Sequence, residues 1–276
     1  MNAHPIGTRT FCSESSLSGA TMKIKVLGAS GAEFPGHNPP SLLLNDRILF
    51  DAGSLTNVLD LKGQLKIRDI FITHAHLDHI TGIPFLAENV AFAEKKSPVR
   101  IFSIPPVIRA IGKHILNGSI WPKFTAIPSP RHPILNLIEL KTGHPIRVRG
   151  YSITPYEVNH SVPAVGYLVE DGKKRRFFYT GDTGPSKDIW ARIGERQLHC
   201  LIIEVSFPNR MEKIAIETSH LTPRLLKREL SKIKRMPERI LVTHLKPRHA
   251  QTIKTELRRF RIENLKFLRD HEVINI

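Results

Sequence analysis

One short stretch limits what this chain can fold into more than any other. Residues 73–79 read THAHLDH, so three imidazoles and one carboxylate fall within six consecutive positions. The segment 69–72 before it predicts a short buried strand, and residues 82–86 after it predict the start of a helix. The cluster is therefore predicted to lie on a tight loop between a strand and a helix, where functional residues often lie.

The side chains of this cluster are typical metal ligands. In an extended segment alternate residues face the same side, so His74 and His76 can bind one ion together. The following turn directs Asp78 and His79 toward a neighbouring point, which suits a second ion. Imidazoles and carboxylates favour Zn²⁺, and Mn²⁺ or Fe²⁺ would accept the same ligands. A lone histidine here would usually be a core residue, but four such side chains together favour a metal site.

Further donors follow apolar runs downstream. His160 and His244 each come directly after a predicted strand. Asp182 lies between two glycines after the strand 177–180, and a carboxylate in such a turn can approach two cations and bridge them. Each residue alone could be an ordinary turn or capping residue. Together they would complete a site for two ions at one edge of a sheet.

The hydrophobic pattern predicts short strands first and amphipathic helices around them. Predicted strands cover 23–27, 41–44, 47–50, 69–72, 146–148, 153–158, 165–169, 177–180, 199–205 and 240–243. Predicted helices begin near residue 82 and cover 107–116, 221–234 and 250–260. The sequence GASG at 28–31 is predicted to be a turn, because neither the dinucleotide fingerprint nor Walker spacing is present.

The order of the candidate donors resembles the metallo-β-lactamase superfamily. Its pattern is an aspartate at a strand end, then HxHxDH, then a single histidine, aspartate and histidine. Asp51 in the sequence FDAG matches the first position and would lie behind the ligands, orienting the loop. The resemblance implies an αββα four-layer sandwich of the α/β (α+β) class, which the order of strands and helices also suits.

The resemblance also implies how the donors divide between two divalent ions. Asp182 belongs to both sets. The first set is His74, His76, His160 and Asp182, and the second is Asp78, His79, Asp182 and His244.

Within this superfamily the chain is most similar to class II cyclic-nucleotide phosphodiesterases, particularly the bacterial ones. The similarity spans roughly residue 22 to the C-terminus and is carried by HAHLDH (74–79), NGSIWP (117–122), GDTG (181–184) and SHLTP (219–223). Leu77 separates the chain from the tRNA 3′-end processing nucleases of the superfamily, which usually carry glycine there. Residues 83–86 differ from the fungal form of the phosphodiesterase motif.

The predicted activity is hydrolysis of 3′,5′-cyclic nucleotides, such as cyclic AMP, to nucleoside monophosphates. A hydroxide held between two cations could attack phosphorus, since metal binding lowers the pKa of water from ~15.7 toward ~7. Asp78 is counted among the catalytic residues, and His220 is the candidate proton donor to the leaving alkoxide. Glu204 ends an apolar strand and could orient His220 or a ligand. The alternative is that His220 is a neighbour of a helix N-terminal cap and does not donate the proton.

The segment 120–124 reads IWPKF and places two aromatic rings and a cation in a predicted loop. Trp121 and Phe124 could stack on a nucleobase, which contributes ~1–3 kcal/mol, and Lys123 could contact a phosphate. The alternative is that both rings pack a lid against the core.

The net charge of +16 keeps a second enzyme function open. A small cyclic nucleotide does not require such a positive field, whereas RNA would use it. The alternative function is therefore an RNA-processing nuclease of the tRNA 3′-end type, with RNA as partner, although charge runs are usually solvated faces. A nucleotide-binding protein with a vestigial metal site is the non-enzyme alternative, which the complete donor set disfavours.

Length and composition predict one catalytic domain over residues 22–276, because 276 residues with 41% hydrophobic content can bury a large core. Residues 1–21 are predicted to be a disordered extension. No apolar stretch approaches the ~20 residues of a membrane span, and Cys12 and Cys200 cannot form a disulfide framework. We therefore expect a cytoplasmic protein that does not contact membranes, and a homodimer remains open.

Overall fold

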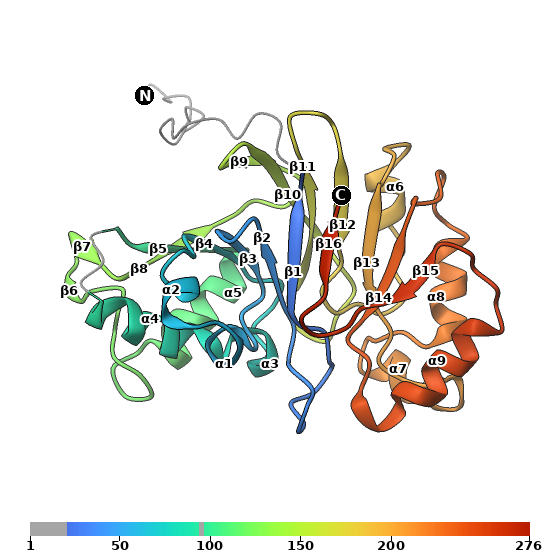
Figure 1. Cartoon of the computed structure of the whole chain (residues 1–276), viewed down its shortest axis with the longest axis horizontal. Coiled ribbons are helices and arrows are strands. Elements are labelled where there is room, and N and C mark those ends of the chain that lie inside the picture. Colours follow the sequence, from blue (N-terminus) through green and yellow to red (C-terminus); the bar gives the residue numbers. More distant parts are fainter. Residues whose placement is uncertain (1–20, 94–96) are drawn as a thin grey trace, which may run out of the picture.

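The computed structural model describes residues 21–93 and 97–276, so the predicted N-terminal extension lies outside the described residues except for its last position. The described residues form two seven-stranded sheets, and helices lie outside each sheet (Figure 1). This arrangement confirms the predicted αββα sandwich. Among the described helices, none combines the length and the apolar character that a membrane crossing requires.

The first sheet is antiparallel at one side and parallel at the other. In spatial order its strands are β16 (Val273–Asn275), β1 (Lys23–Gly28), β2 (Ser41–Leu44), β3 (Ile48–Phe50), β4 (Asp69–Phe71), β5 (Val99–Ser103) and β8 (Leu135–Glu139). The pairs from β3 to β8 are parallel, so their connections must cross over. The helices of these connections are α1 (Leu55–Val58), α2 (Leu61–Gln64), α3 (Leu77–Ile80), α4 (Gly82–Phe92) and α5 (Pro105–Ala110).

The second sheet is also mixed. In spatial order its strands are β15 (Leu265–Phe267), β14 (Ile240–Thr243), β13 (Cys200–Glu204), β12 (Arg176–Tyr179), β11 (Val165–Glu170), β10 (Tyr151–Glu157) and β9 (Ile146–Val148). The pairs from β12 to β15 are parallel, and the others are antiparallel. Its outer helices are α6 (Ile189–Ile193), α7 (Glu212–Glu217), α8 (Pro223–Leu230) and α9 (Ala250–Arg258). A separate hairpin pairs β6 (Pro128–Ser129) with β7 (His132–Pro133).

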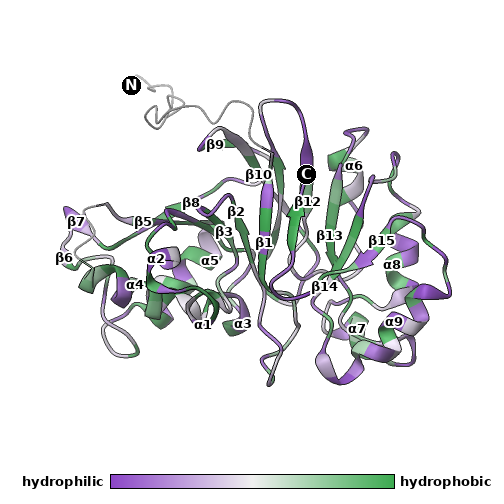
Figure 2. Ribbon diagram, in the orientation of Figure 1, coloured by the Kyte–Doolittle hydropathy of each residue, from purple (hydrophilic) through white to green (hydrophobic). Residues whose placement is uncertain are grey.

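Alternate side chains of strand β12 pack into two different cores, one on each face of the second sheet. Successive side chains of a strand point to opposite faces. Phe177 and Tyr179 belong to the core between the two sheets, whereas Phe178 belongs to the core between the second sheet and its helices. Aromatic rings fill the inner core, and Phe71 and Phe102 stack with centroids 4.7 Å apart. In Figure 2 the strands are mostly hydrophobic and the outer helices are mixed, as this burial on both sheet faces requires.

The predicted strands are all present, and the helix near residue 82 begins there. Strands β5, β6, β7, β8, β15 and β16 were not predicted. The helix expected over 107–116 begins at Pro105 and ends in a π-helical turn (Ile111–Ile115). The helix expected over 221–234 covers Pro223–Leu230. Its start is set by Thr222, which accepts from the Leu225 amide at 3.3 Å, and by Pro223 in its first turn.

Candidate metal centre

One edge of the sandwich collects the candidate donors. Strands β12 and β14 run parallel through β13, and β10 runs in the same direction because β10 and β12 are both antiparallel to β11. His160, Asp182 and His244 therefore follow strand ends at a common edge of the second sheet. The loop after β4 faces them from the first sheet, and the Val165 amide donates to the Thr73 carbonyl across the junction at 3.0 Å.

The first donor group contains three imidazoles. His76 Nδ1 lies 3.1 Å from His74 Nε2 and 3.3 Å from His160 Nε2. Asp182 Oδ2 lies 3.8 Å from His74 Nε2. Two nitrogens bound to one tetrahedral zinc at ~2.0–2.1 Å would be about 3.3 Å apart. The spacing of these imidazole nitrogens therefore matches that of ligands on one ion.

The second donor group adjoins the first and shares Asp182 with it. His244 Nε2 lies 3.5 Å from Asp78 Oδ2 and 3.3 Å from Asp182 Oδ2. His79 Nε2 lies 3.5 Å from Asp182 Oδ1. Asp182 therefore stands between the two groups, within reach of both.

Unpaired buried atoms show that this edge fits cations. Among the described residues, His79 Nε2, His244 Nε2 and Asp182 Oδ1 are buried and have no hydrogen-bond partner. A buried polar atom without a partner is unfavourable by about 1–3 kcal/mol. Divalent ions would satisfy all three atoms at once, and the donor set is one that such ions accept.

Outer hydrogen bonds fix which ring nitrogen faces the centre. His79 Nδ1 donates to Asp51 Oδ2 at 2.8 Å, His160 Nδ1 to the Ser219 carbonyl at 3.2 Å, and His244 Nδ1 to Ser206 Oγ at 2.8 Å. A neutral imidazole that carries its proton on Nδ1 presents a lone pair on Nε2. These bonds therefore direct three lone pairs toward the donor groups.

Asp51 lies behind the metal loop and accepts several hydrogen bonds. Besides His79, the Thr73 amide and the Tyr179 hydroxyl each donate to its carboxylate at 2.8 Å. The Asp51 backbone has φ +56°, a left-handed conformation that aspartate and asparagine tolerate better than most residues. The contacts are those expected of a residue that orients the loop.

Burial and neighbouring charge shift the protonation of the donors. Burial lowers the pKa of His74 well below its ordinary value. For His79 burial acts in the same direction, but the Asp51 and Asp182 carboxylates outweigh it and raise the pKa. For Asp182 burial would raise the pKa, but His244 and His79 lower it well below its ordinary range. Asp182 is therefore ionised and His74 neutral, the forms that bind a cation, whereas His79 must release its Nε2 proton when a cation binds.

His220 lies next to the donors and is held by Glu204. Its Nδ1 donates to Glu204 Oε1 at 2.7 Å, and its ring stacks on His244 with centroids 5.6 Å apart. One ring nitrogen lies within 4.8 Å of donor atoms of Asp182 and His244. Burial acts to lower the pKa of His220, but the Glu204 carboxylate outweighs it, so the pKa lies above its ordinary value.

Comparison with known protein families identifies the family of this chain. A family model described as a beta-lactamase superfamily domain matches residues 46–245. The chain belongs to the metallo-β-lactamase superfamily. Its fold implies divalent metal ions, and the chain is a hydrolase of this superfamily. The predicted family is thus confirmed.

Two relatives of this chain are named for different enzyme activities. The chain is 28% identical to a ribonuclease Z of Methanococcus maripaludis, over 88% of the chain and 94% of the relative. It is 26% identical to a probable 3′,5′-cyclic-nucleotide phosphodiesterase of Yersinia pestis, over 88% of the chain and 83% of the relative. Ribonucleases Z are the more numerous relatives. Both names belong to enzymes that act on phosphodiester bonds.

The solved structure of unliganded yeast PDE1 shares the fold of this superfamily hydrolase. The two superpose with a TM-score of 0.79, covering 93% of the chain and 99% of the yeast protein, at 20% identity. At this identity the likeness concerns the fold alone.

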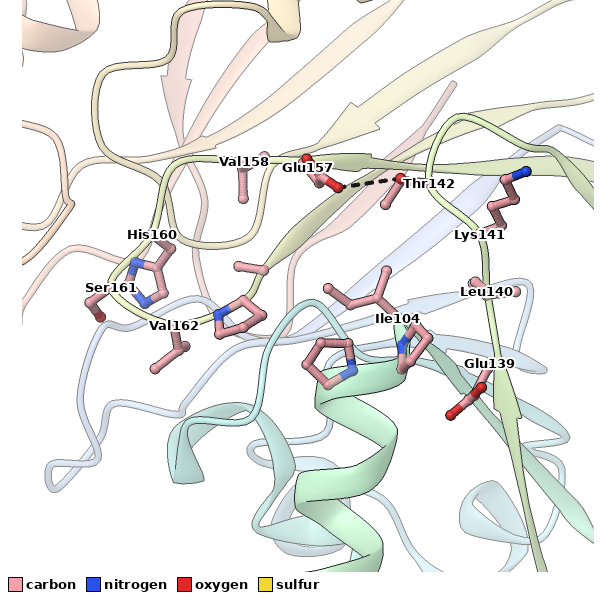
Figure 3. Close-up of a pocket in the computed structure, with 14 residues that line it drawn as sticks. Ile104, Glu139, Leu140, Lys141, Thr142, Glu157, Val158, His160, Ser161 and Val162 are labelled. Atoms are coloured by element: carbon pink, nitrogen blue, oxygen red, sulfur yellow. Dashed lines mark hydrogen bonds between the residues drawn. The ribbon is translucent and has the colours of Figure 1, made fainter.

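A cavity of about 760 Å³ lies beside the metal centre of this metallo-β-lactamase-fold hydrolase (Figure 3). His160 contributes to the cavity wall as well as to the first donor group. The remaining wall comes from segments at the ends of β5, β8 and β10, namely residues 104–106, 139–142, 157–158 and 161–164. Sequence reasoning did not find this cavity, because its walls come from three segments far apart in the chain.

The three residues predicted to bind the substrate, Trp121, Lys123 and Phe124, differ in their exposure and packing. Phe124 is 6% exposed and belongs to the core, so its ring packs inside and a stacking role on a base is wrong for it. Trp121 packs partly against the same core, its Nε1 donates to the Pro84 carbonyl at 3.0 Å, and its ring meets Phe85 edge-on at 5.2 Å. Lys123 is exposed. The packing alternative therefore holds for Phe124.

Ser206 is a site residue that the sequence analysis missed. Its hydroxyl donates to Glu204 Oε2 at 2.9 Å and accepts from His244 Nδ1. It thereby connects the His220 pair to a donor of the second group. A serine two residues beyond a strand has no distinctive sequence signal, so only the approach of the segments reveals it.

Proposed function

We propose that this protein is a metal-dependent phosphodiesterase that hydrolyses 3′,5′-cyclic nucleotides to nucleoside monophosphates. The observation that carries the proposal is the cavity beside the metal centre. Its volume of about 760 Å³ lies within the range typical of pockets for small molecules. Because His160 belongs to both places, a ligand filling the cavity would place its phosphate next to the donor groups.

In this proposal the donors form two ligand sets, in agreement with the distances between their donor atoms. When bound, two divalent ions, most simply Zn²⁺, neutralise phosphoryl oxygens and make water reactive near neutral pH. Asp182 belongs to both sets because its two oxygens contact both groups. The first set is His74, His76, His160 and Asp182, and the second is Asp78, His79, Asp182 and His244.

Two residues of the chain are assigned to the reaction itself. His220 donates a proton to the leaving oxygen, and Glu204 holds its ring by the hydrogen bond at Nδ1. The Asp78 side chain is 32% exposed, whereas the other carboxylate of the centre is buried. Asp78 therefore lies where a substrate approaches and is assigned to catalysis as well as to binding.

Comparison of four substrates tests the proposal. Metal-replete protein is incubated with cyclic AMP, cyclic GMP, an aryl phosphodiester and a 3′-extended tRNA precursor, beside Asp182→Ala as the inactive control. We expect hydrolysis of the cyclic nucleotides to the monophosphates. Hydrolysis of the aryl phosphodiester without either cyclic nucleotide would reject the proposed substrate while retaining the phosphodiesterase chemistry.

An RNA-processing nuclease is the second candidate, favoured by the net charge of +16 and by the ribonuclease Z relatives. An RNA substrate would release counterions on binding, so its affinity should fall steeply with salt. Cleavage of the tRNA precursor at its 3′ end, together with salt-sensitive RNA binding, would support this candidate over the first.

A further inference from the structure

The cavity beside His160 combines an apolar wall with an unpaired carboxylate. Ile104, Leu140 and Ala164 are buried residues of this wall, and prolines add to it. Glu157 also lines the cavity but is exposed, and within residues 21–93 and 97–276 it forms no ion pair, although Lys141 lines the same cavity. A carboxylate beside a site for anionic phosphodiesters would repel the substrate unless it meets hydrogen-bond donors there.

One oxygen of Glu157 is already oriented. Thr142 Oγ1 donates to Glu157 Oε1 at 3.4 Å, and Figure 3 shows the two side chains pointing toward each other at one edge of the cavity. No described residue donates to the second oxygen, and a carboxylate accepts hydrogen bonds without donating any. Glu157 can therefore accept two adjacent N–H groups from a ligand in the cavity.

The position of Glu157 suits the base of a nucleotide whose phosphate is at the metal centre. It ends β10, three residues before His160. Three residues of extended chain span at most about 10 Å. A nucleoside monophosphate has a length of the same order, so its two ends can reach both residues.

We propose that the cavity binds a guanine base and that Glu157 accepts its N1–H and exocyclic N2–H groups, so that the enzyme prefers cyclic GMP to cyclic AMP. This inference rests on the proposed cyclic-nucleotide function. Adenine presents an acceptor, N1, beside a single donor group at the same edge. A carboxylate would meet that acceptor with like partial charge, and the second hydrogen bond would be lost. The apolar wall would contact either purine equally.

The substitution Glu157→Gln tests the inference directly. A glutamine amide offers one acceptor and one donor, which complement the N6 amino group and N1 of adenine. A bidentate pair discriminates bases by about 5- to 150-fold. Because Glu157 is exposed, we expect a change near the lower limit, about fivefold in the ratio of kcat/KM for cyclic GMP to that for cyclic AMP. The ratio cancels differences in the amount of active enzyme.

The matched control is Glu139→Gln, which neutralises the other glutamate of the cavity wall, at the far end of the segment 139–142. Wild type should prefer cyclic GMP, Glu157→Gln should lose or reverse that preference, and Glu139→Gln should keep it. An unchanged ratio in Glu157→Gln, or an equal change in Glu139→Gln, would overturn the inference.

A binding measurement separates this inference from the proposed function. Calorimetric titration of the metal-replete wild type and Glu157→Gln with GMP and AMP reports base preference without turnover. If the wild type hydrolyses neither cyclic nucleotide, the proposed function fails, and the titration still decides the role of Glu157. Equal affinities of the wild type for GMP and AMP would overturn the guanine assignment even if both cyclic nucleotides are hydrolysed.

Discussion

The metal centre and the neighbouring cavity are built in different ways. At the centre, His79, His160 and His244 each have one ring nitrogen held by a second residue. The carboxylate of Asp51, which holds His79, also accepts from the Thr73 amide and the Tyr179 hydroxyl. In the cavity, Glu157 has one long hydrogen bond and is exposed. A substitution at the centre should therefore disturb a whole network, whereas one in the cavity should change ligand binding and leave the metal centre intact.

Asp182→Ala should have a larger effect on the metal centre than the other substitutions. Removing the carboxylate that contacts both donor groups takes a ligand from each proposed ion, so bound metal and turnover should both be lost. Metal content after dialysis and hydrolysis of an aryl phosphodiester measure the two effects. Asp188→Ala, at an exposed position, is the control and should retain both. Full metal content in Asp182→Ala would contradict the bridging assignment.

His220→Ala should retain metal and slow the reaction by about 10²- to 10⁴-fold, the usual contribution of a general acid. The loss should be smaller for a 4-nitrophenyl phosphodiester, because 4-nitrophenolate leaves without needing a proton. Parallel rates on this ester and on a cyclic nucleotide test the point. Equal losses on both substrates would argue against proton donation, and lost metal would identify His220 as a ligand.

Asp51→Asn should weaken metal binding by about 10–100-fold without abolishing it, as expected for a residue that orients a ligand. Asparagine accepts the left-handed backbone but cannot accept hydrogen bonds through its amide nitrogen. Competition with a chelator measures the affinity. Tyr179→Phe, which removes one donor to the same carboxylate, should have a smaller effect. Unchanged affinity in Asp51→Asn would show that the network does not position the loop.

Val162→Ala should have the smallest effect and should leave metal content unchanged. Val162 lines the cavity and is partly buried, so its truncation removes apolar contact with the substrate. The substitution removes two carbon atoms, each of which contributes about 0.8 kcal/mol when fully buried. Because Val162 is only partly buried, KM for the cyclic nucleotide should rise a few-fold. Steady-state kinetics measure this change. A loss of bound metal in Val162→Ala would show that the cavity and the centre are not independent.

The sequence predicted most reliably the donors that are neighbours along the chain. Residues of the HAHLDH motif must be close in space because they are close in the chain. The approach of His160, Asp182 and His244 depends on the order of strands in the second sheet, which only the family resemblance supplied. Ser206 depends on a contact between segments 38 residues apart, and no local pattern marks it.

Strand β5 shows a similar limit. Its Arg100 is a charged residue in a strand that is otherwise buried, which weakens the apolar pattern. Arg100 Nε contacts Asp69 on the neighbouring strand at 2.5 Å, and Arg149 Nε contacts the other oxygen of this buried carboxylate at 2.5 Å. The charge is thus satisfied by residues far away in sequence, and this pairing becomes visible only when the sheet is assembled.

The proposed ligands come from both sheets. His74 and His76 lie on the loop after β4, Asp78 and His79 lie in α3, and the other three follow strands of the second sheet. An ion can bind all of them only after the two sheets have docked, so its binding free energy adds to the free energy of unfolding. At a free metal concentration of 100 times Kd, one such site would contribute about 2.7 kcal/mol. The thermal midpoint of this protein should therefore depend on metal supply, and starvation for the ion would deplete the folded enzyme as well as its activity.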